Sequence, residues 1–207
     1  MRALSTFLGL AFLLLLELCT ANGQGALWVR KMRTVFARLD SNHDNRLTRK
    51  DFLALGVHII RCCKLDSMQR MNQIMMMESD AWDKFFAGPG TPRSVQERGI
   101  SERQFVDAMR REMQSPETSK NLRNMYHFVF GYMDHDQDGM LTFTEYADMP
   151  RCSGVPDAFI QANFDTLDTD ADGVIQEAEF IEAAKQYYTT NDESNRYNHV
   201  LYGPLVN

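Results

Sequence analysis

Apolar residues recur every three or four positions along most of the chain, a spacing that predicts helices rather than strands. The first such face comprises Trp28, Met32, Val35, Phe36 and Leu39. Similar patterns predict further helices over residues 51–64, 65–86, 102–113, 122–133, 144–148, 157–167 and 177–189. Ser115–Pro116 marks the junction between two halves, because proline is tolerated at a helix start but breaks a helix interior. Apolar residues also recur in the segment 191–207, which we expect to pack back on the helices.

Two polar stretches between the predicted helices carry carboxylates at a fixed spacing. Residues 134–145 read DHDQDGMLTFTE, and residues 168–179 read DTDADGVIQEAE. Both place acidic residues at positions 1, 3, 5 and 12 and glycine at position 6, which is the pattern of an EF-hand calcium loop. An ordinary Asp-rich turn has no need of a glutamate at position 12, so the pattern indicates calcium binding.

Calcium takes six to eight oxygen ligands, which a loop of this spacing supplies from alternate side chains, one backbone carbonyl and a final carboxylate. In the third hand we predict the ligands to be Asp134, Asp136, Asp138, the Met140 carbonyl, Thr142 through water, and Glu145. In the fourth hand they are Asp168, Asp170, Asp172, the Val174 carbonyl, Gln176 and Glu179. Gly139 and Gly173 provide the positive φ of the sharp turn. Leu141 and Ile175, at position 8, are expected to join the two loops through a short β-pairing.

A third loop, over residues 40–51, follows the pattern less strictly. Its predicted ligands are Asp40, Asn42, Asp44, the Arg46 carbonyl, Thr48 and Asp51. Asn45 replaces the glycine at position 6, and Asp51 is one methylene shorter than glutamate. The lower net charge and the shorter final ligand predict weaker calcium binding and competition by Mg²⁺. A vestigial loop without metal is the alternative.

EF-hands pair, so the first hand needs a partner between it and the third. Residues 93–104 end in GISERQ and resemble the second half of a loop, with Ile100 at position 8. Positions 1, 3 and 5 would be Arg93, Val95 and Glu97, which cannot form a calcium cage. We therefore predict a degenerate hand that binds no calcium; an unrelated linker is the alternative. The predicted fold is all-α, with four helix–loop–helix units in two pairs, over residues 24–114 and 115–190, and a tail over 191–207.

The first 23 residues differ from the rest of the chain. Arg2 is followed by an uninterrupted apolar run over residues 7–16 and then by small residues, which is typical of a secretory signal peptide. Cleavage is expected after Ala21 or Gly23. The run is short for a membrane span, so a permanent anchor is the lesser alternative. The chain lacks an ER retention tetrapeptide at its end, which favours secretion over residence in the ER lumen.

Composition narrows the functions further. The formal net charge of −6 disfavours nucleic acid as a partner. After removal of the leader, Cys62, Cys63 and Cys152 remain, and one bridge from Cys62 or Cys63 to Cys152 is possible in an oxidising compartment. Three buried free cysteines are equally compatible with the sequence. A zinc site at His58, Cys62 and Cys63 is disfavoured because nothing in the sequence completes a tetrahedral set.

The segments flanking the loops resemble one family. WVRKMRTVF (28–36), AWDKFF (81–86) and YGPL (202–205) are similar to the sarcoplasmic calcium-binding proteins, over residues 26–207. Luciferin-binding proteins and photoproteins share the occupancy of hands one, three and four. The resemblance implies a compact fold with the two EF-hand pairs packed face to face. The leader departs from the family, whose members are typically cytosolic.

Three functions are compatible with these observations. The leading one is a secreted, monomeric protein that binds about three calcium ions for buffering, storage or transport, in an extracellular or mineralising matrix. A calcium sensor with a protein partner is the second, because methionines cluster over residues 68–77. A calcium-gated carrier of an apolar chromophore is the third. The five histidines form no recognisable catalytic group, so no enzyme activity is expected.

Overall fold

The computed structural model describes residues 25–65, 67–85 and 97–206. The predicted signal peptide and positions 1 and 3 of the degenerate loop, Arg93 and Val95, lie outside them. In the first half, the elements are α2 (Ala26–Leu39), β1 (Arg46–Leu47), α3 (Arg49–Cys62), α4 (Met68–Phe85), β2 (Ile100–Ser101) and α6 (Glu102–Met113). In the second half, they are α7 (Thr118–Met133), β3 (Met140–Leu141), α8 (Phe143–Cys152), α9 (Asp157–Leu167), β4 (Ile175–Gln176) and α10 (Glu177–Thr189).

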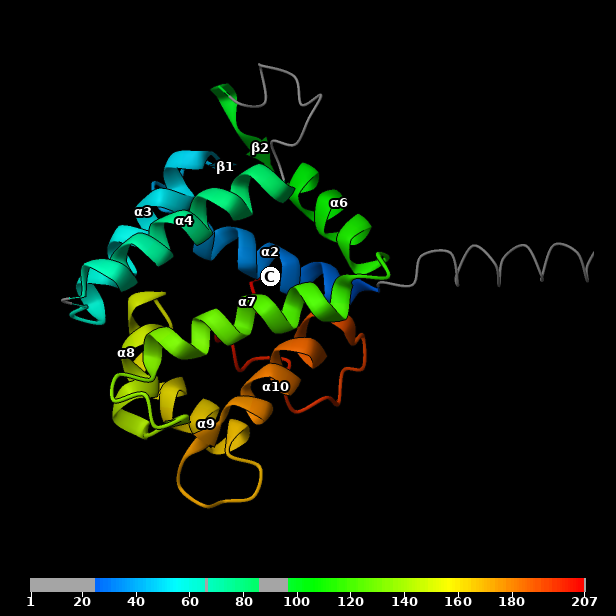
Figure 1. Cartoon of the computed structure of the whole chain (residues 1–207). Coiled ribbons are helices and arrows are strands. Elements are labelled where there is room, and N and C mark those ends of the chain that lie inside the picture. The colour runs from blue at the N-terminus through cyan, green and yellow to red at the C-terminus, as the bar shows by residue number, and fades with distance from the viewer. Residues whose placement is uncertain (1–24, 66, 86–96, 207) are drawn as a thin grey trace, which may run out of the picture.

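Two antiparallel strand pairs organise the helices into an all-α EF-hand fold. Strand β1 pairs with β2, with Leu47 opposite Ile100, and β3 pairs with β4, with Leu141 opposite Ile175. Figure 1 shows α2, α3, α4 and α6 above α7, and α9 and α10 below it. The predicted β-pairing of Leu141 with Ile175 is confirmed, and Leu47 and Ile100 form the same pairing in the first half. Residues 97–104 are thus a true EF-hand partner of the first loop rather than a linker.

The helices after the loops begin where position 9 and position 12 form a reciprocal cap. Thr142 Oγ1 accepts a hydrogen bond from Glu145 N (3.4 Å), and Glu145 Oε2 accepts one from Thr142 N (2.9 Å). Thr48 with Asp51, Ser101 with Gln104 and Gln176 with Glu179 form the same capping box. The residues that close a calcium loop therefore also satisfy the free N–H groups of the helix that follows.

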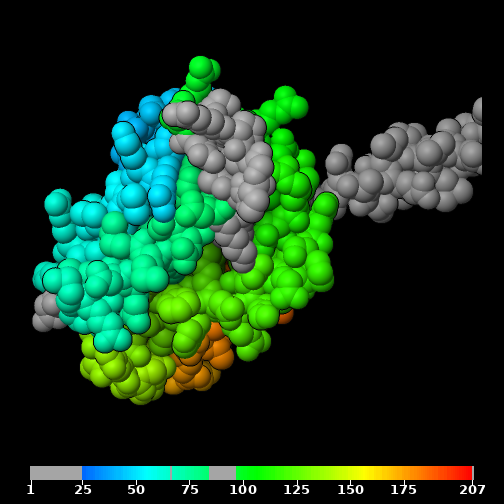
Figure 2. All heavy atoms as spheres, turned by 45° about the horizontal axis from the view of Figure 1, so that its top comes forward, coloured from blue at the N-terminus to red at the C-terminus, as the bar shows by residue number. Residues whose placement is uncertain are grey.

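The two halves share one core. Trp28, on α2, is completely buried, and its Nε1 donates a hydrogen bond to the carbonyl of Tyr188 on α10 (2.7 Å). The same cluster includes Phe105 of the first half and Phe164 of the second. Figure 2 shows the surface of α3 and α4 (cyan) continuing directly into that of α6 and α7 (green). The arrangement is compact, as the family resemblance implies.

Cys62 forms the disulfide with Cys152, and Cys63 is a buried free thiol. This settles in the structure the pairing that the sequence left open, and it joins α3 of the first half to α8 of the second. The tail contacts the helices: Val200 is buried, and Val206 N donates to Thr34 Oγ1 (3.0 Å). Among the described residues, none of the helices has both the length and the apolar character needed to cross a bilayer.

Candidate functional site: three loops with one hydrogen-bond network

Each of the three loops begins at the end of a helix. Asp40, Asp134 and Asp168 are the C-caps of α2, α7 and α9. Their N–H groups donate to the carbonyls of Phe36 (2.9 Å), Phe130 (3.0 Å) and Phe164 (2.9 Å), one turn earlier. Because these phenylalanines are buried in the core, the first ligand of each loop has a fixed position relative to the packed helices.

The three loops share the same two left-handed residues. At position 4, φ is 57° for His43, 62° for Gln137 and 59° for Ala171; at position 6, it is 62° for Asn45, 83° for Gly139 and 91° for Gly173. Asparagine adopts this region more readily than most residues, so Asn45 reproduces the turn that glycine makes in the other loops. The exchange of glycine for asparagine at position 6 therefore preserves the backbone turn of loop 40–51.

Side-chain oxygens at positions 1, 3 and 5 accept hydrogen bonds from the loop's own backbone. Position 1 accepts from the N–H of position 6 in all three loops: Asn45 to Asp40 (2.8 Å), Gly139 to Asp134 (3.0 Å) and Gly173 to Asp168 (3.0 Å). Position 3 accepts from position 5: Asp44 to Asn42 (2.9 Å), Asp138 to Asp136 (3.2 Å) and Asp172 to Asp170 (3.3 Å). Position 5 accepts from position 7: Arg46 to Asp44 (2.9 Å), Met140 to Asp138 (2.8 Å) and Val174 to Asp172 (3.1 Å). These bonds turn the side chains toward the inside of the loop.

The position-12 carboxylate closes each loop from the other side. One oxygen of Asp51, Glu145 and Glu179 accepts from the N–H of position 9 at 2.9 Å in every case. The other oxygen contacts position 2, where Glu145 accepts from His135 N (3.1 Å) and Glu179 accepts from Thr169 N (2.6 Å). Asp51 instead accepts from the Ser41 hydroxyl (2.9 Å). The shorter side chain thus closes its loop through a side chain, where glutamate reaches the backbone.

Oxygen atoms of Asp134, Asp136 and Glu145 lie within 4.8 Å of one another, as do those of Asp168, Asp170 and Glu179. Loop 40–51 has one carboxylate fewer, because asparagine (Asn42) occupies position 3. The amide nitrogen of Asn42 donates a hydrogen bond to Asp44 (3.0 Å). Asp134 Oδ1 is buried and has no hydrogen-bond partner among the described residues. A hard cation would satisfy that oxygen, and the crowded oxygens fit calcium chemistry.

Hydrogen-bond donors within the third loop favour the ionised form of Glu145. Burial of Glu145 favours its neutral form, but hydrogen bonds from Thr142, His135 and Asp136 outweigh burial and lower its pKa below the ordinary value. The group is therefore an anion at neutral pH, as a calcium ligand must be. His135, at position 2 of the loop, is exposed and is not one of the predicted ligands.

The degenerate hand keeps the frame of a loop and lacks its charge. Gln104, at position 12, accepts from Ser101 N through Oε1 (2.9 Å), as the glutamates do elsewhere, but it brings no negative charge. The Arg46 guanidinium, from the paired loop, donates to the carbonyls of Arg98 and of Gly99 (2.9 Å to Gly99). From the sequence, Arg46 is predicted only to supply a carbonyl ligand and a positive charge that offsets the loop carboxylates. Its contact with the partner loop could not be read from spacing, because it depends on the β1–β2 register.

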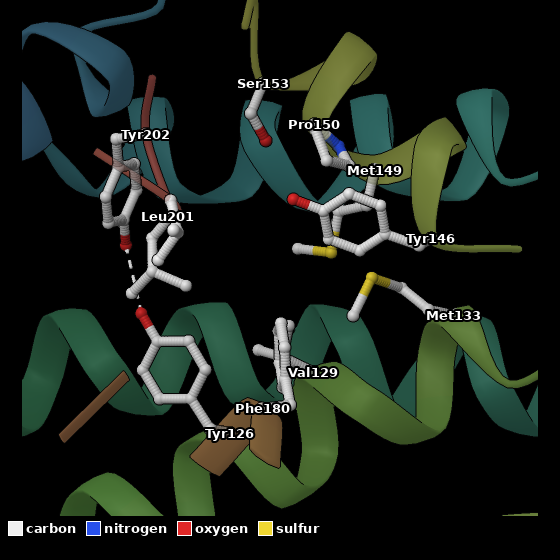
Figure 3. A pocket seen from close by; sticks show the side chains of 11 residues that line it. Tyr126, Val129, Met133, Tyr146, Met149, Pro150, Ser153, Phe180, Leu201 and Tyr202 are labelled. Atoms are coloured by element: carbon white, nitrogen blue, oxygen red, sulfur yellow. Dashed lines mark hydrogen bonds between the residues drawn. The ribbon is translucent and has the colours of Figure 1, made fainter. Parts of the chain in front are cut away.

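A cavity of about 170 Å³ lies between the two halves and is bordered by residues of α2, α3, α4, α6, α7 and α8. Five methionines line it, Met77, Met109, Met113, Met125 and Met149, together with the carboxyl group of Glu78. A smaller adjoining cavity of about 80 Å³ shares Tyr126 and Tyr202 with it (Figure 3). The hydroxyls of Tyr126, Tyr188 and Tyr202 contact one another at 2.8–3.4 Å.

The methionine-rich segment divides between the interior and the surface. Met77 lines the cavity, and Met75 packs close to Gly56 of α3. Met68 and Met76 are 70% and 65% exposed. The inward positions of Met75 and Met77 indicate that this segment fills the core, which disfavours a methionine groove for a target helix.

Comparison with known proteins identifies the family. A model of an EF-hand domain pair matches residues 155–187. The sarcoplasmic calcium-binding protein of Perinereis vancaurica tetradentata is 30% identical over 182 residues, which are 87% of this chain and 99% of that protein. The chain belongs to the sarcoplasmic calcium-binding protein family. It is therefore a calcium-binding protein of the EF-hand type, as its loops indicate.

Other members and neighbours of the family are known by the small molecules they bind. The luciferin-binding protein of Renilla reniformis is 24% identical over 180 residues, which are 86% of this chain and 94% of that protein. The crystal structure of okadaic acid binding protein 2.1 has a TM-score of 0.75 and 20% identity, over 89% of this chain and 98% of that one. The fold of the family is thus shared by proteins with different ligands.

Proposed function

We propose that this protein is a secreted calcium buffer or carrier that binds about three calcium ions, one in each of the loops 40–51, 134–145 and 168–179. The observation that carries the proposal is the common hydrogen-bond network, which turns the side chains of positions 1, 3, 5 and 12 inward in all three loops. The names of the curated relatives describe binding proteins, which supports a role without catalysis.

The first loop should be the weakest of the three. It has two carboxylates and an amide where loops three and four have three carboxylates, and its position-12 side chain is shorter. Calcium favours more and longer-reaching oxygen ligands, whereas the smaller Mg²⁺ favours a compact octahedron. We therefore expect Mg²⁺ to compete at loop 40–51.

Secretion rests on the leader, residues 1–23, and the Cys62–Cys152 disulfide supports it, because such bonds persist mainly in oxidising compartments. Extracellular calcium is about millimolar, so calcium occupies even modules with dissociation constants of about 10⁻⁴–10⁻³ M. Filled loops would stabilise the folded chain by mass action.

Calorimetric titration of the mature chain with Ca²⁺, with and without Mg²⁺, tests the proposal. Two tight sites and one weaker site that Mg²⁺ weakens further are expected. Asp51→Asn should remove the weak site only, and the exposed Asp165→Asn serves as its matched control. Absence of any strong site would overturn the function, and a Mg²⁺-insensitive third site would overturn the assignment of loop 40–51.

A second candidate function is the calcium-gated transport of a small apolar molecule. The cavity between the halves favours it, since five flexible methionines line a space that they can enlarge by changing rotamers. At about 170 Å³ it is below the size of most ligand pockets, about 300–1,000 Å³, so a ligand of that size requires this adjustment. The names of the luciferin-binding and okadaic acid binding proteins agree with such a role.

An uncharged fluorescent dye, titrated in the absence and presence of calcium, tests the carrier function. Stoichiometric binding without calcium and release on its addition are expected. Met125→Trp fills the cavity and should abolish binding, whereas Met76→Trp places the same side chain on the surface. Equal dye binding by both variants, or none by the native chain, would exclude the carrier and leave the buffer intact.

A further inference from the structure

One cluster of metal-ligating side chains lies apart from the calcium loops. His58 and Cys62 are one turn apart on α3, and Cys152 ends α8. The ligand atoms of these three residues lie within 4.8 Å of one another. The histidine is exposed and both cysteines are partly exposed, so ions and thiols from solvent can reach the cluster. The sequence could not complete this set, because Cys152 is 90 residues from Cys62.

The geometry matches a tetrahedral sulfur–nitrogen site. In such a site Zn–S is about 2.3 Å and Zn–N about 2.0–2.1 Å, which places the nitrogen and the sulfur about 3.5 Å apart. His58 Nε2 lies 3.7 Å from Cys62 Sγ. The helix therefore already presents these two ligands at the separation that zinc requires.

We propose that, when the Cys62–Cys152 disulfide is reduced, His58, Cys62 and Cys152 bind one Zn²⁺ ion, with water as the fourth ligand. A dithiol supplies the two electrons: it becomes a disulfide, the S–S bond breaks, and each sulfur gains a proton. Zn²⁺ then displaces both thiol protons and binds the two thiolates and neutral His58. Oxidation by a disulfide compound reverses the sequence and releases the ion. The site thus exchanges a covalent bridge between α3 and α8 for a metal bridge.

The neighbouring thiol does not take part. Cys63 is 3% exposed and belongs to a core cluster with Ile59 and Tyr132. A thiol packed in the core, away from solvent, is a poor metal ligand. The calcium loops do not compete either, because they offer only oxygen, whereas zinc favours sulfur and nitrogen.

Cobalt spectroscopy on the full mature chain tests the proposal. The protein is reduced with a phosphine under argon, freed of reductant, saturated with Ca²⁺ and titrated with Co²⁺. We expect a thiolate-to-cobalt charge-transfer band and intense tetrahedral visible bands that saturate at one equivalent, and stoichiometric Zn²⁺ should remove them. The oxidised protein should show neither band. Cobalt bound by EF-hand oxygens gives no thiolate band, so the result is independent of calcium binding.

Variants identify the ligands. Cys152→Ser should abolish the charge-transfer band, and His58→Ala should weaken Co²⁺ binding by more than about 100-fold, beyond the usual effect of losing an outer-shell partner. Cys63→Ala and His127→Ala, which alter a neighbouring thiol and another exposed histidine, should leave binding unchanged. A reduced protein without the band overturns the site. An unchanged affinity in His58→Ala, or loss of the band in Cys63→Ala, overturns the assigned ligands.

Discussion

The last side chain of each calcium loop has two separate tasks. One oxygen of Glu179 caps the helix that follows by accepting from Gln176 N, and the other accepts from Thr169 N across the loop. Replacing its charge by an amide keeps the shape of the side chain and removes one of the proposed calcium ligands. Gln104 of the degenerate hand shows that an amide preserves the cap.

Glu179→Gln is therefore expected to leave the fold intact and to weaken calcium binding in the fourth loop by about 100-fold or more. Calorimetric titration should lose one tight site and retain the one in the third loop. Glu182→Gln makes the same change one turn later on α10, at an exposed position, and should bind like the native chain. If the two variants bound calcium equally, Glu179 would not be a ligand.

Glu78 differs from the loop carboxylates because it is 6% exposed and lines the cavity. Burial raises its pKa from 4.5 to about 7. Between these values the folded chain holds a proton that the unfolded chain has lost, so stability falls as pH rises. The stabilisation that protonated Glu78 gives the folded chain is complete below pH 4.5 and absent above about pH 7.

Urea unfolding in saturating calcium should therefore show the native chain losing about 2–3 kcal/mol between pH 5 and pH 8 relative to Glu78→Gln. The glutamine variant cannot ionise and lacks this loss. Glu182→Gln should follow the native curve. Parallel pH profiles for the native chain and Glu78→Gln would show that Glu78 is charged throughout.

The geometry of the loops is easier to predict from the sequence than the burial of titratable groups, for a physical reason. Ligand spacing is local, since twelve consecutive residues surround one ion. Burial of Glu78 depends on helices from both halves, and nothing near it in the sequence distinguishes it from the exposed Glu182. Cys62 and Cys63 are likewise adjacent, and a helix points neighbouring side chains about 100° apart. Which of them meets Cys152 depends on how α3 packs against α8.

Between loops, the short strands couple one hand to its partner. Gly99 precedes β2 with a φ of +69°, and a Cβ atom there would lie 2.3 Å from the carbonyl oxygen of Leu47. Leu47 is completely buried and pairs with Ile100. The close approach of the two backbones thus holds the first calcium loop against its degenerate partner.

Gly99→Ala should destabilise the chain by about 1–3 kcal/mol, because alanine is strained at this φ and displaces β1. Metal affinity should fall in the first loop and stay unchanged in the other two. Gly131→Ala is the control: Gly131 lies inside α7 with nothing within 4 Å of an added Cβ. Alanine there should stabilise the chain by about 0.5–1 kcal/mol. Thermal unfolding and calcium titration measure both effects, and equal behaviour would exclude the coupling.

Most helices could be predicted, but their ends could not. The helix predicted over 122–133 begins at Thr118, whose hydroxyl donates to the carbonyls of Glu112 (2.5 Å) and Ser115 (2.7 Å). The helix predicted over 144–148 continues to Cys152 through Pro150. Proline normally ends a helix, but here Pro150 is buried, and the disulfide at Cys152 holds the last turn. Long-range packing therefore outweighs the local signal.

On the scale of the complete chain, the tail connects the first helix to the last. Arg38 Nε donates to the Tyr202 carbonyl (3.3 Å), and the Tyr202 hydroxyl contacts those of Tyr126 and Tyr188. Burial raises the pKa of Tyr126 and of Tyr188 well above the ordinary value, so these hydroxyls stay neutral. The sequence predicted that the tail packs on the body but not that it borders both cavities, because the cavity walls come from distant segments.

Ending the chain after Asn198 removes the buried Val200 and the partly exposed Tyr202. This should lower stability by about 2–4 kcal/mol, because complete burial of one such side chain contributes about 1.5–3 kcal/mol and Tyr202 contributes only part of that. It also removes one wall of both cavities, so an uncharged apolar dye should bind more strongly to this variant than to the native chain. A chain that ends after Gly203 keeps Tyr202, and the described residues that it loses, 204–206, are partly exposed, so its stability and dye binding should stay close to native. Because both variants lose the contact of Val206 with Thr34, their difference isolates the part of the tail that covers the cavities. If the two truncations had equal effects on urea unfolding and dye fluorescence, the tail would act through residues 204–207 alone.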